Sequence, residues 1–260
     1  MRKIYLLIIA AALTTTSASS GADGTIWFGN MDESPLIFRV DSDESIPVWI
    51  QTNPDVCAAA VHIPLSTADA FITKRLGGTL YKPFVNDEPP EGFQKGWDMA
   101  EIKDASPHQN KEGYTSQGIL GFSNLNRKPN LPLNCEKPCL IAEFYVHTAA
   151  DDSLKGHTYD VLIEGYDIPN KGINLSDTLG IYTFQLETIF SQVYFLFPGD
   201  INNDFKIDDS DLKALKTYFE KKIKLPWPEL RADCDGNSVI DLDDLHYLEN
   251  YLNGNGKAPR

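Results

Sequence analysis

The sequence predicts a mainly β protein that ends in a small all-α domain. Between residues 25 and 197, about nine short runs have strand character, and turns rich in Gly, Pro, Asn and Asp separate them. From residue 200 onward the pattern changes to two acidic loops, each followed by apolar residues at helical spacing. About 170 residues of short strands favour a jelly-roll β-sandwich for the long domain.

The strand signal is clearest in residues 46–51, 140–147 and 159–164, which alternate with the period of two that a half-buried strand shows. Further strands are expected at residues 25–28, 36–40, 58–64, 118–122, 181–186 and 192–197. Prolines and glycines interrupt the pattern between residues 76 and 117. We therefore expect a long excursion there, with one short strand near residues 97–102.

The first 22 residues have the composition of a secretory signal. Arg2 and Lys3 precede an apolar run over residues 4–13, and residues 20–22, Ser-Gly-Ala, offer a cleavage site. The apolar run is too short to span a bilayer, so we expect an exported protein without a membrane span. The expected layout is a signal at 1–22, a sandwich domain at 23–197, a C-terminal module at 198–254 and a flexible tail at 255–260.

The charge of the chain narrows the choice of partner. Its net charge is -14, and residues 23–198 carry 24 acidic against 12 basic residues. This balance argues against nucleic acid or an anionic membrane surface as a partner.

Four cysteines are distributed too sparsely for a paired zinc motif. Export permits disulfides. Cys135 and Cys139 could close a small loop, whereas we expect Cys57 and Cys234 to be free, largely buried thiols.

The C-terminal module contains a repeat. Residues 200–212 recur 33 residues later as residues 233–245, both beginning at an aspartate and ending at a leucine. The correspondence continues through the pairs Leu215 and Leu248, Tyr218 and Tyr251, and Phe219 and Leu252. A repeat of this kind predicts two copies of one structural unit.

Each repeat has oxygen-bearing residues at the spacing of an EF-hand calcium loop, positions 1, 3, 5, 7, 9 and 12. A hard cation requires six to eight oxygen ligands, and alternate residues of a tight loop can point toward it. In loop one (residues 200–211) the expected ligands are Asp200, Asn202, Asp204, the carbonyl of Lys206, Asp208 and Asp211. In loop two (residues 233–244) they are Asp233, Asp235, Asn237, the carbonyl of Val239, Asp241 and Asp244. Two calcium ions are expected.

Two positions depart from the usual loop. Position 6, commonly Gly, is Phe205 in loop one and Ser238 in loop two. A side chain there implies a costly backbone conformation. Position 12 is Asp rather than Glu in both loops, so each following helix must lie closer to the ion.

Neither loop has a helix before it, and each is followed by a helix bearing leucines on one face. Two such half EF-hands, joined by a linker over about residues 221–231, resemble the type I dockerin. The resemblance implies that calcium keeps the module folded and that the module docks onto a cohesin of a partner protein. It also implies partner contacts at loop positions 10 and 11, which are Asp209, Ser210, Leu242 and Asp243. Because these pairs differ, we expect the two repeats to present different faces.

In some dockerins an aromatic residue before loop one packs against a residue after the second helix. The candidates here are Phe195 or Phe197 with Pro259.

The long domain resembles the cohesin-like β-sandwich, a superfamily that includes several carbohydrate-binding modules. The resemblance rests on the order of segments 45–50, 58–65, 140–146 and 156–163. It implies a binding module rather than an enzyme.

Catalytic motifs are absent from the sequence: it contains no G-x-S-x-G, H-E-x-x-H or P-loop pattern. Glu143, on an alternating strand, is the acidic residue that best fits a glycosidase role, although a solvent-facing strand acid is the more ordinary interpretation. Trp49, Trp97, Tyr114 and Tyr145 are candidates for stacking on sugars, with burial the commoner fate of such residues.

The leading hypothesis is a secreted, non-catalytic component of an extracellular, cellulosome-like, polysaccharide-degrading complex. Its dockerin would dock onto a cohesin, and its sandwich would act as an adaptor for a second dockerin or as a binding module. The alternatives are a carbohydrate-binding protein and a dockerin-tethered glycoside hydrolase of unrecognised type.

Overall fold

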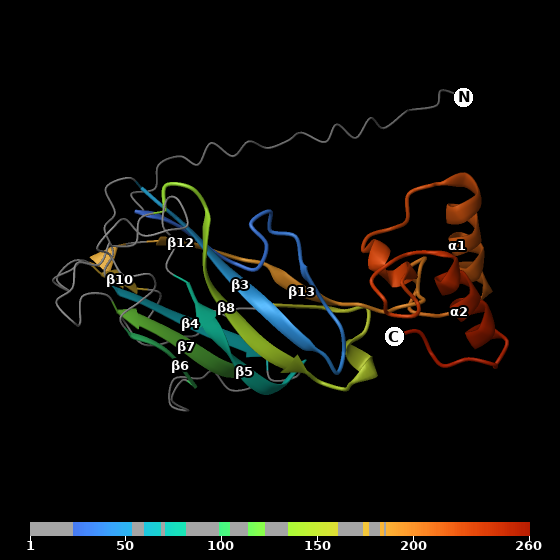
Figure 1. The fold of residues 1–260 in the computed structure, drawn as a ribbon, viewed down its shortest axis with the longest axis horizontal. Helices are drawn as coiled ribbons and strands as arrows, with labels where there is room; N and C mark the ends of the chain where they lie inside the picture. Colours follow the sequence, from blue (N-terminus) through green and yellow to red (C-terminus); the bar gives the residue numbers. More distant parts are fainter. Residues whose placement is uncertain are drawn as a thin grey trace, which may run out of the picture.

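The computed structural model describes residues 23–53, 60–68, 71–81, 99–104, 114–122, 135–160, 174–176, 183–184 and 186–260. A β domain is followed by a small module with helices α1 (Asp209–Lys221) and α2 (Leu242–Leu252) (Figure 1). The expected fold class, mainly β and then a small α-helical module, is confirmed. The expected signal at residues 1–22, Cys57 and Trp97 lie outside the described residues.

The first sheet has five strands, in the order β12 (Leu186–Phe190), β1 (Gly24–Phe28), β3 (Asp43–Thr52), β8 (Cys139–Thr148) and β5 (Ile72–Leu80). Strand β1 pairs parallel with β12, and the other pairs are antiparallel. Burial alternates along β3, where Ile46, Val48 and Ile50 are inside and the odd-numbered residues are partly exposed. One face of this sheet therefore covers the core and the other faces solvent.

The second sheet also has five strands, in the order β11 (Thr183–Phe184), β10 (Asn174–Ser176), β4 (Ala60–Ala68), β7 (Tyr114–Phe122) and β6 (Met99–Asp104). A smaller sheet joins β2 (Leu36–Phe38), β13 (Gln192–Phe195) and β9 (Thr158–Asp160). The last strand of the domain, β13, leads directly into the C-terminal module (Figure 1).

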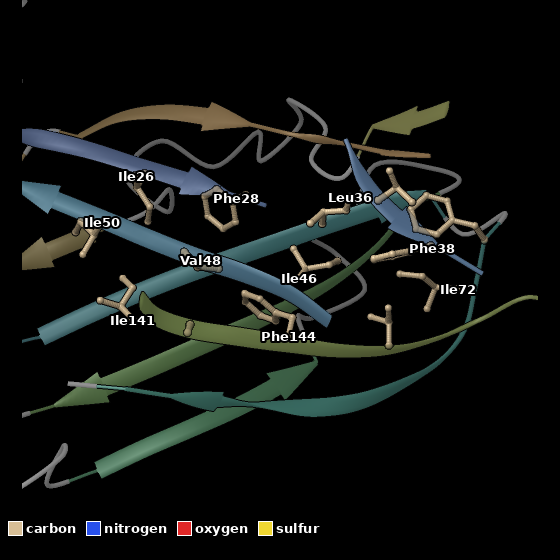
Figure 2. Packing of buried hydrophobic residues seen from close by; sticks show 14 of the residues in the cluster. Ile26, Phe28, Leu36, Phe38, Ile46, Val48, Ile50, Ile72, Ile141 and Phe144 are labelled. Atoms are coloured by element: carbon tan, nitrogen blue, oxygen red, sulfur yellow. The ribbon is translucent and has the colours of Figure 1, made fainter. Parts of the chain in front are cut away.

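The core of the β domain is apolar and rich in aromatic residues (Figure 2). Alternate residues of β1, β3 and β8 point into it, as period-two burial requires. The largest wholly buried side chains are Phe28, Phe38, Phe71, Phe144, Phe195, Ile26, Ile46, Ile50 and Ile141.

Three strands were not predicted. Strand β5 occupies residues where no strand was expected and where the long excursion was expected to begin, and β10 was also missed. Strand β12 overlaps the expected strand at residues 181–186 only at Leu186. The sequence of β5, ITKRLGGTL, has two glycines and no regular alternation, so its local strand propensity is low. Pairing with β8, including two register shifts, holds β5 in the sheet. Strand β6 lies where the short strand near residues 97–102 was expected.

The described cysteines are free thiols. Cys135 and Cys139 do not form the small disulfide loop that was considered, and the Cys139 thiol donates to the Lys137 carbonyl. Cys234 is a buried free thiol, as expected. No helix in the described part of the chain has both the length and the apolar character needed to cross a bilayer.

An exposed ion-pair cluster lies where β3 begins and β8 ends, and it predicts how one histidine titrates with pH. His147 Nδ1 lies 2.6 Å from Asp43 Oδ1, and its Nε2 lies 3.2 Å from Asp41 Oδ1. The hydrogen bond to Asp43, with that to Asp41, raises the pKa of His147 above its ordinary value. A raised histidine pKa stabilises the fold at pH values below the unfolded pKa, and this contribution is lost as pH rises through the folded pKa.

We therefore expect the His147 ring protons to titrate at a higher pH than those of an exposed histidine in a proton NMR titration. Asp43→Asn should move the midpoint toward the ordinary value, and His246→Gln provides the assignment control. An unchanged midpoint in the Asp43 variant would contradict the assigned cause.

Candidate metal centre

Helices α1 and α2 begin in the same way, at the ends of the two acidic loops. Asp208 and Asp241 are the N-cap residues, and each accepts a hydrogen bond from the backbone two residues later. Asp211 and Asp244 complete a reciprocal capping box at each start. The position-12 carboxylates thus stand in the first turn of each helix, where the helix dipole also favours negative charge.

Loop one is closed by its own carboxylates. Asp211 Oδ1 accepts the backbone N–H groups of Ile201 and Asn202, at 2.7 and 3.0 Å. At the other end of the loop, Asp200 accepts those of Asp204 and Phe205, at 2.9 and 3.1 Å. These bonds fold positions 1 to 6 around the first carboxylate.

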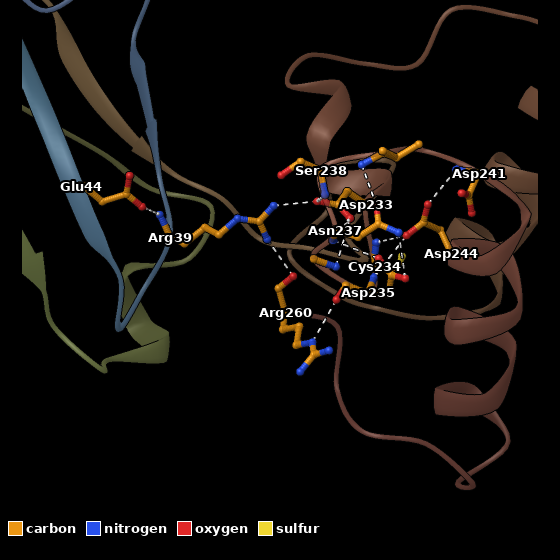
Figure 3. A network of polar contacts seen from close by, with 12 residues as sticks. Arg39, Glu44, Asp233, Cys234, Asp235, Asn237, Ser238, Asp241, Asp244 and Arg260 are labelled. Carbon is orange, nitrogen blue, oxygen red and sulfur yellow. Dashed lines mark hydrogen bonds and ion pairs between the residues drawn. The ribbon is translucent and has the colours of Figure 1, made fainter.

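Loop two repeats this arrangement bond for bond. Asp244 Oδ1 accepts Cys234 N and Asp235 N, at 2.7 and 3.2 Å, and Asp233 accepts Asn237 N and Ser238 N, at 3.0 and 3.1 Å. Oxygen atoms of Asp233, Asp235 and Asp244 all lie within 4.8 Å of one another (Figure 3). Loop one, whose residues are all described, has no three acidic oxygens gathered as closely.

The unusual residues at position 6 adopt the backbone expected of a glycine. Phe205 has φ of 65° and Ser238 has φ of 68°, both in the left-handed region. Position 4 is also left-handed in both loops, at Asn203 and Gly236. The costly conformation expected from the sequence is therefore present at position 6 in both repeats.

The site concentrates negative charge away from water. The side chains of Asp200, Asp211, Asp233 and Asp244 are wholly buried. Burial raises the pKa of Asp200 and Asp244 above the ordinary value, with neighbouring acids acting in the same direction. Buried carboxylates require a partner cation, and this set of carboxylate, amide and carbonyl oxygens fits calcium.

Residues 198–253 match the family model of the dockerin type I domain. The C-terminal module is thus a type I dockerin, which is a calcium-binding domain. No match is found among curated protein sequences.

Solved structures similar to this chain include cohesin modules. They include the sixth cohesin of Acetivibrio cellulolyticus scaffoldin B, solved with a Cel5 dockerin: TM-score 0.42, 11% identity, covering 66% of this chain and 98% of that one. A non-cellulosomal cohesin of Archaeoglobus fulgidus has a TM-score of 0.37 and 16% identity, and the match covers 68% of this chain and 93% of that one. A cohesin module of a Clostridium perfringens family 33 glycoside hydrolase has a TM-score of 0.39 and 13% identity, and the match covers 67% of this chain and 98% of that one.

The four predicted partner-contact residues are all exposed at the helix starts. Ser210 Oγ donates to Asp208 and accepts from the Asn202 side chain, so its hydroxyl is already engaged in the loop. Leu242 is 56% exposed, a high value for a leucine. The two repeats therefore present different surfaces, one polar and one with an apolar side chain.

Pro259, proposed to contact Phe195 or Phe197, is buried. The structure places its ring over Gly199, where an added Cβ would lie 2.8 Å from Pro259 Cγ. The tail thus closes over the start of loop one.

The sequence did not reveal that the β domain contacts both acidic loops. Arg39, which follows β2, donates from Nη2 to Asp233 Oδ2 at 2.7 Å and from Nη1 to the Arg260 backbone oxygen at 2.7 Å (Figure 3). Glu44 accepts the backbone N–H of Arg39 at 2.8 Å, which fixes the base of this side chain. Arg39 lies in the connection between β2 and β3, and nothing in the sequence around it indicates a contact with a loop almost 200 residues away.

A second contact joins loop one to the β domain. The Phe205 ring stacks on His157 at 5.3 Å and lies over Gly156, where an added Cβ would be 2.8 Å from the ring. Nearby, the buried Arg231 side chain donates from Nε to the Tyr194 hydroxyl at 3.1 Å. Both loops therefore face the β domain, and α1 and α2 lie on the side of the module farther from it (Figure 1).

The Arg39 contact gives a prediction for calcium affinity. The positively charged guanidinium of Arg39 lies 2.7 Å from the carboxylate of Asp233, which is predicted to bind the second ion. Repulsion between a unit charge and a divalent cation a few ångströms apart is on the order of 1 kcal/mol even in a water-like dielectric. We therefore expect Arg39→Gln to raise the affinity of loop two for calcium by about tenfold.

The measurement is a calorimetric calcium titration of the full chain. Lys257→Gln makes the same change in net charge on an exposed residue of the tail and should leave the titration unchanged. Reduced affinity in the Arg39 variant would instead mean that the guanidinium orients Asp233 for the ion.

Proposed function

We propose that this protein is a non-catalytic component of an extracellular protein complex, attached to a cohesin-bearing partner by its calcium-loaded dockerin. The observation that carries the proposal is the pair of equivalent acidic loops, each closed by a buried position-12 aspartate and followed by a helix. The family match over residues 198–253 supports it.

In this proposal calcium stabilises the shape of the docking surface. The predicted ligands would be the carboxylates, amides and carbonyls of loops one and two, with two ions bound. The same carboxylates hold the backbone N–H groups of their loops and cap α1 and α2. A cation that neutralises these buried charges therefore fixes the helix starts, where the partner-contact residues lie.

The test is binding of the full chain to a panel of immobilised type I cohesin modules, measured by biolayer interferometry with calcium and with EGTA. We expect at least one cohesin to bind in calcium and to release the chain in EGTA. The double variant Asp211→Ala and Asp244→Ala should not bind. Equal binding in calcium and EGTA, or no binding across the panel, would refute the proposal.

The adaptor role adds that the β domain itself accepts a second dockerin. The order of predicted strands in the sequence supports this part of the proposal. Its test uses a dockerin from another protein as the soluble partner, with this chain immobilised through its own dockerin. Failure of this binding would remove the adaptor role and leave the docking role intact.

Export and a non-catalytic role complete the proposal. The charged and apolar pattern of residues 1–22 supports export, and cleavage after a signal is measured by N-terminal sequencing of protein secreted from a heterologous host. The lack of catalytic motifs supports a binding role rather than the hydrolase alternative.

A further inference from the structure

The outer face of the first sheet carries a row of apolar side chains across four strands. Backbone register places Ile189 of β12 beside Trp27 of β1, Trp27 beside Trp49 of β3, and Trp49 beside Leu140 of β8. All four side chains are partly exposed, whereas the inward neighbours of the two tryptophans, Ile26, Phe28, Val48 and Ile50, are wholly buried. With strands about 4.8 Å apart, the row extends about 14 Å across the sheet.

A hydrogen-bonded polar cluster adjoins this row. The hydroxyls of Tyr81 and Tyr145 both donate to Glu143 Oε2, at 2.7 and 3.0 Å, and Thr79 Oγ1 lies 3.1 Å from the Tyr145 hydroxyl. Within the described residues, the other carboxylate oxygen of Glu143, Oε1, has no hydrogen bond. Glu143 is paired in register with Pro47, two residues from Trp49 on the same face. An oriented acceptor thus stands beside the aromatic row.

This combination matches the chemistry of a sugar chain. Indole faces are flat and carry negative π charge, so they attract the weakly positive C–H groups on the apolar face of a pyranose ring. A fixed carboxylate oxygen accepts hydrogen bonds from sugar hydroxyls, and charge-assisted hydrogen bonds are among the stronger ones. Two tryptophans on neighbouring strands give two adjacent stacking positions, as a repeating chain requires.

The charge of the face selects among sugar chains. The strands that carry the row, β1, β3, β8 and β12, place Asp43, Glu143 and Glu187 on this side together with His147, and no lysine or arginine. Beyond them, the edge strand β5 carries Lys74, in register with His147 at the end of β8 far from the row. An anionic polysaccharide would be repelled. We propose that the outer face of this sheet, centred on Trp27 and Trp49, binds a neutral polysaccharide.

The proposed face is separate from the dockerin. Arg39 holds the dockerin near the start of β3, and Trp49 lies six residues beyond the first residue of that strand, about 20 Å along it. The chain can therefore bind a polysaccharide and a cohesin at the same time. The inference stands on the β domain alone and does not depend on the proposed docking function.

The test is a pull-down of the full chain, in calcium, on swollen cellulose, insoluble xylan and insoluble mannan, with affinity electrophoresis in polygalacturonate as the anionic comparison. We expect retention on at least one neutral polysaccharide and none in polygalacturonate. The double variant Trp27→Ala and Trp49→Ala should lose at least tenfold in affinity, and Glu143→Gln should lose several-fold. Trp227→Ala, which removes a 51% exposed tryptophan from the dockerin linker, is the matched control.

Three results would overturn the proposal: no retention on any of the three neutral polysaccharides, unchanged retention of the double variant, or equal loss in the Trp227 control. If the double variant fails to fold by circular dichroism, the single variants Trp27→Thr and Trp49→Thr, which keep good strand formers, replace it. Calcium-dependent cohesin binding of each variant is measured in parallel. Loss of cohesin binding together with unchanged sugar retention would identify the face as a protein contact and also overturn the proposal.

Discussion

Asp244→Ala should remove calcium binding at loop two and lower the stability of the dockerin in calcium by about 3 kcal/mol. The Asp244 carboxylate is wholly buried, accepts two N–H groups on Oδ1 and accepts Asp241 N on Oδ2 at 2.8 Å. Its removal leaves three backbone donors without an acceptor, and each buried donor costs about 1–3 kcal/mol, less where water reaches it. It also removes a predicted ligand, so the loss of calcium adds to the loss of hydrogen bonds.

The measurement is thermal unfolding of the full chain by circular dichroism at 222 nm, which follows the helices, together with a calcium titration. Asp244→Asn keeps an amide oxygen for the backbone donors and should be less destabilised, while still binding calcium weakly at loop two. Glu220→Gln, an exposed change on α1, is the charge-matched control. In EGTA the difference in stability between wild type and Asp244→Asn should shrink to the loss of the Asp241 N hydrogen bond, because the amide has one acceptor oxygen in place of two. A calcium titration of Asp244→Ala with two intact sites would contradict the assignment.

The equivalence of the two loops was predictable because each depends on local chemistry. Position-1 and position-12 aspartates bond to backbone groups within twelve residues of themselves, so the spacing in the sequence contains the information. The left-handed backbone at Phe205 and Ser238 followed from the same spacing. The sequence could not supply the role of Phe205 against His157, because that contact depends on how the module sits beside the β domain.

The strands too fall into those that local sequence predicts and those that depend on distant contacts. Strand β3 has regular alternation and was predicted, since half-burial of one face imposes that period. Strand β5 depends on pairing with β8, and its Gly77 and Gly78 offer no local signal. The row that contains Trp27 and Trp49 was only partly predictable from sequence: Trp49 was a candidate for stacking on a sugar, but its neighbour across the sheet is fixed by strand order, which alternation does not specify.

Leu242→Ala should reduce affinity for a cohesin partner by about 30-fold while leaving calcium binding unchanged. Leu242 is 56% exposed at the first position of α2, and its side chain lies outside the loop hydrogen bonds. Covering a leucine side chain with a partner contributes about 2 kcal/mol more than covering an alanine, which corresponds to about 30-fold in affinity. The equivalent residue of the first repeat is Asp209, which offers no apolar surface.

Binding is measured as a dissociation constant for the cohesin identified in the panel experiment. Ile223→Ala is the matched control, because Ile223 is 50% exposed in the linker after α1, away from the helix starts. Leu242→Asp, which gives the second repeat the residue of the first, should weaken binding further than Leu242→Ala. If both Leu242 variants bind as wild type and Ser210→Asp abolishes binding, then the first repeat is the docking face. The cohesin would then recognise the polar start of α1, and Leu242 at the start of α2 would remain exposed in the complex.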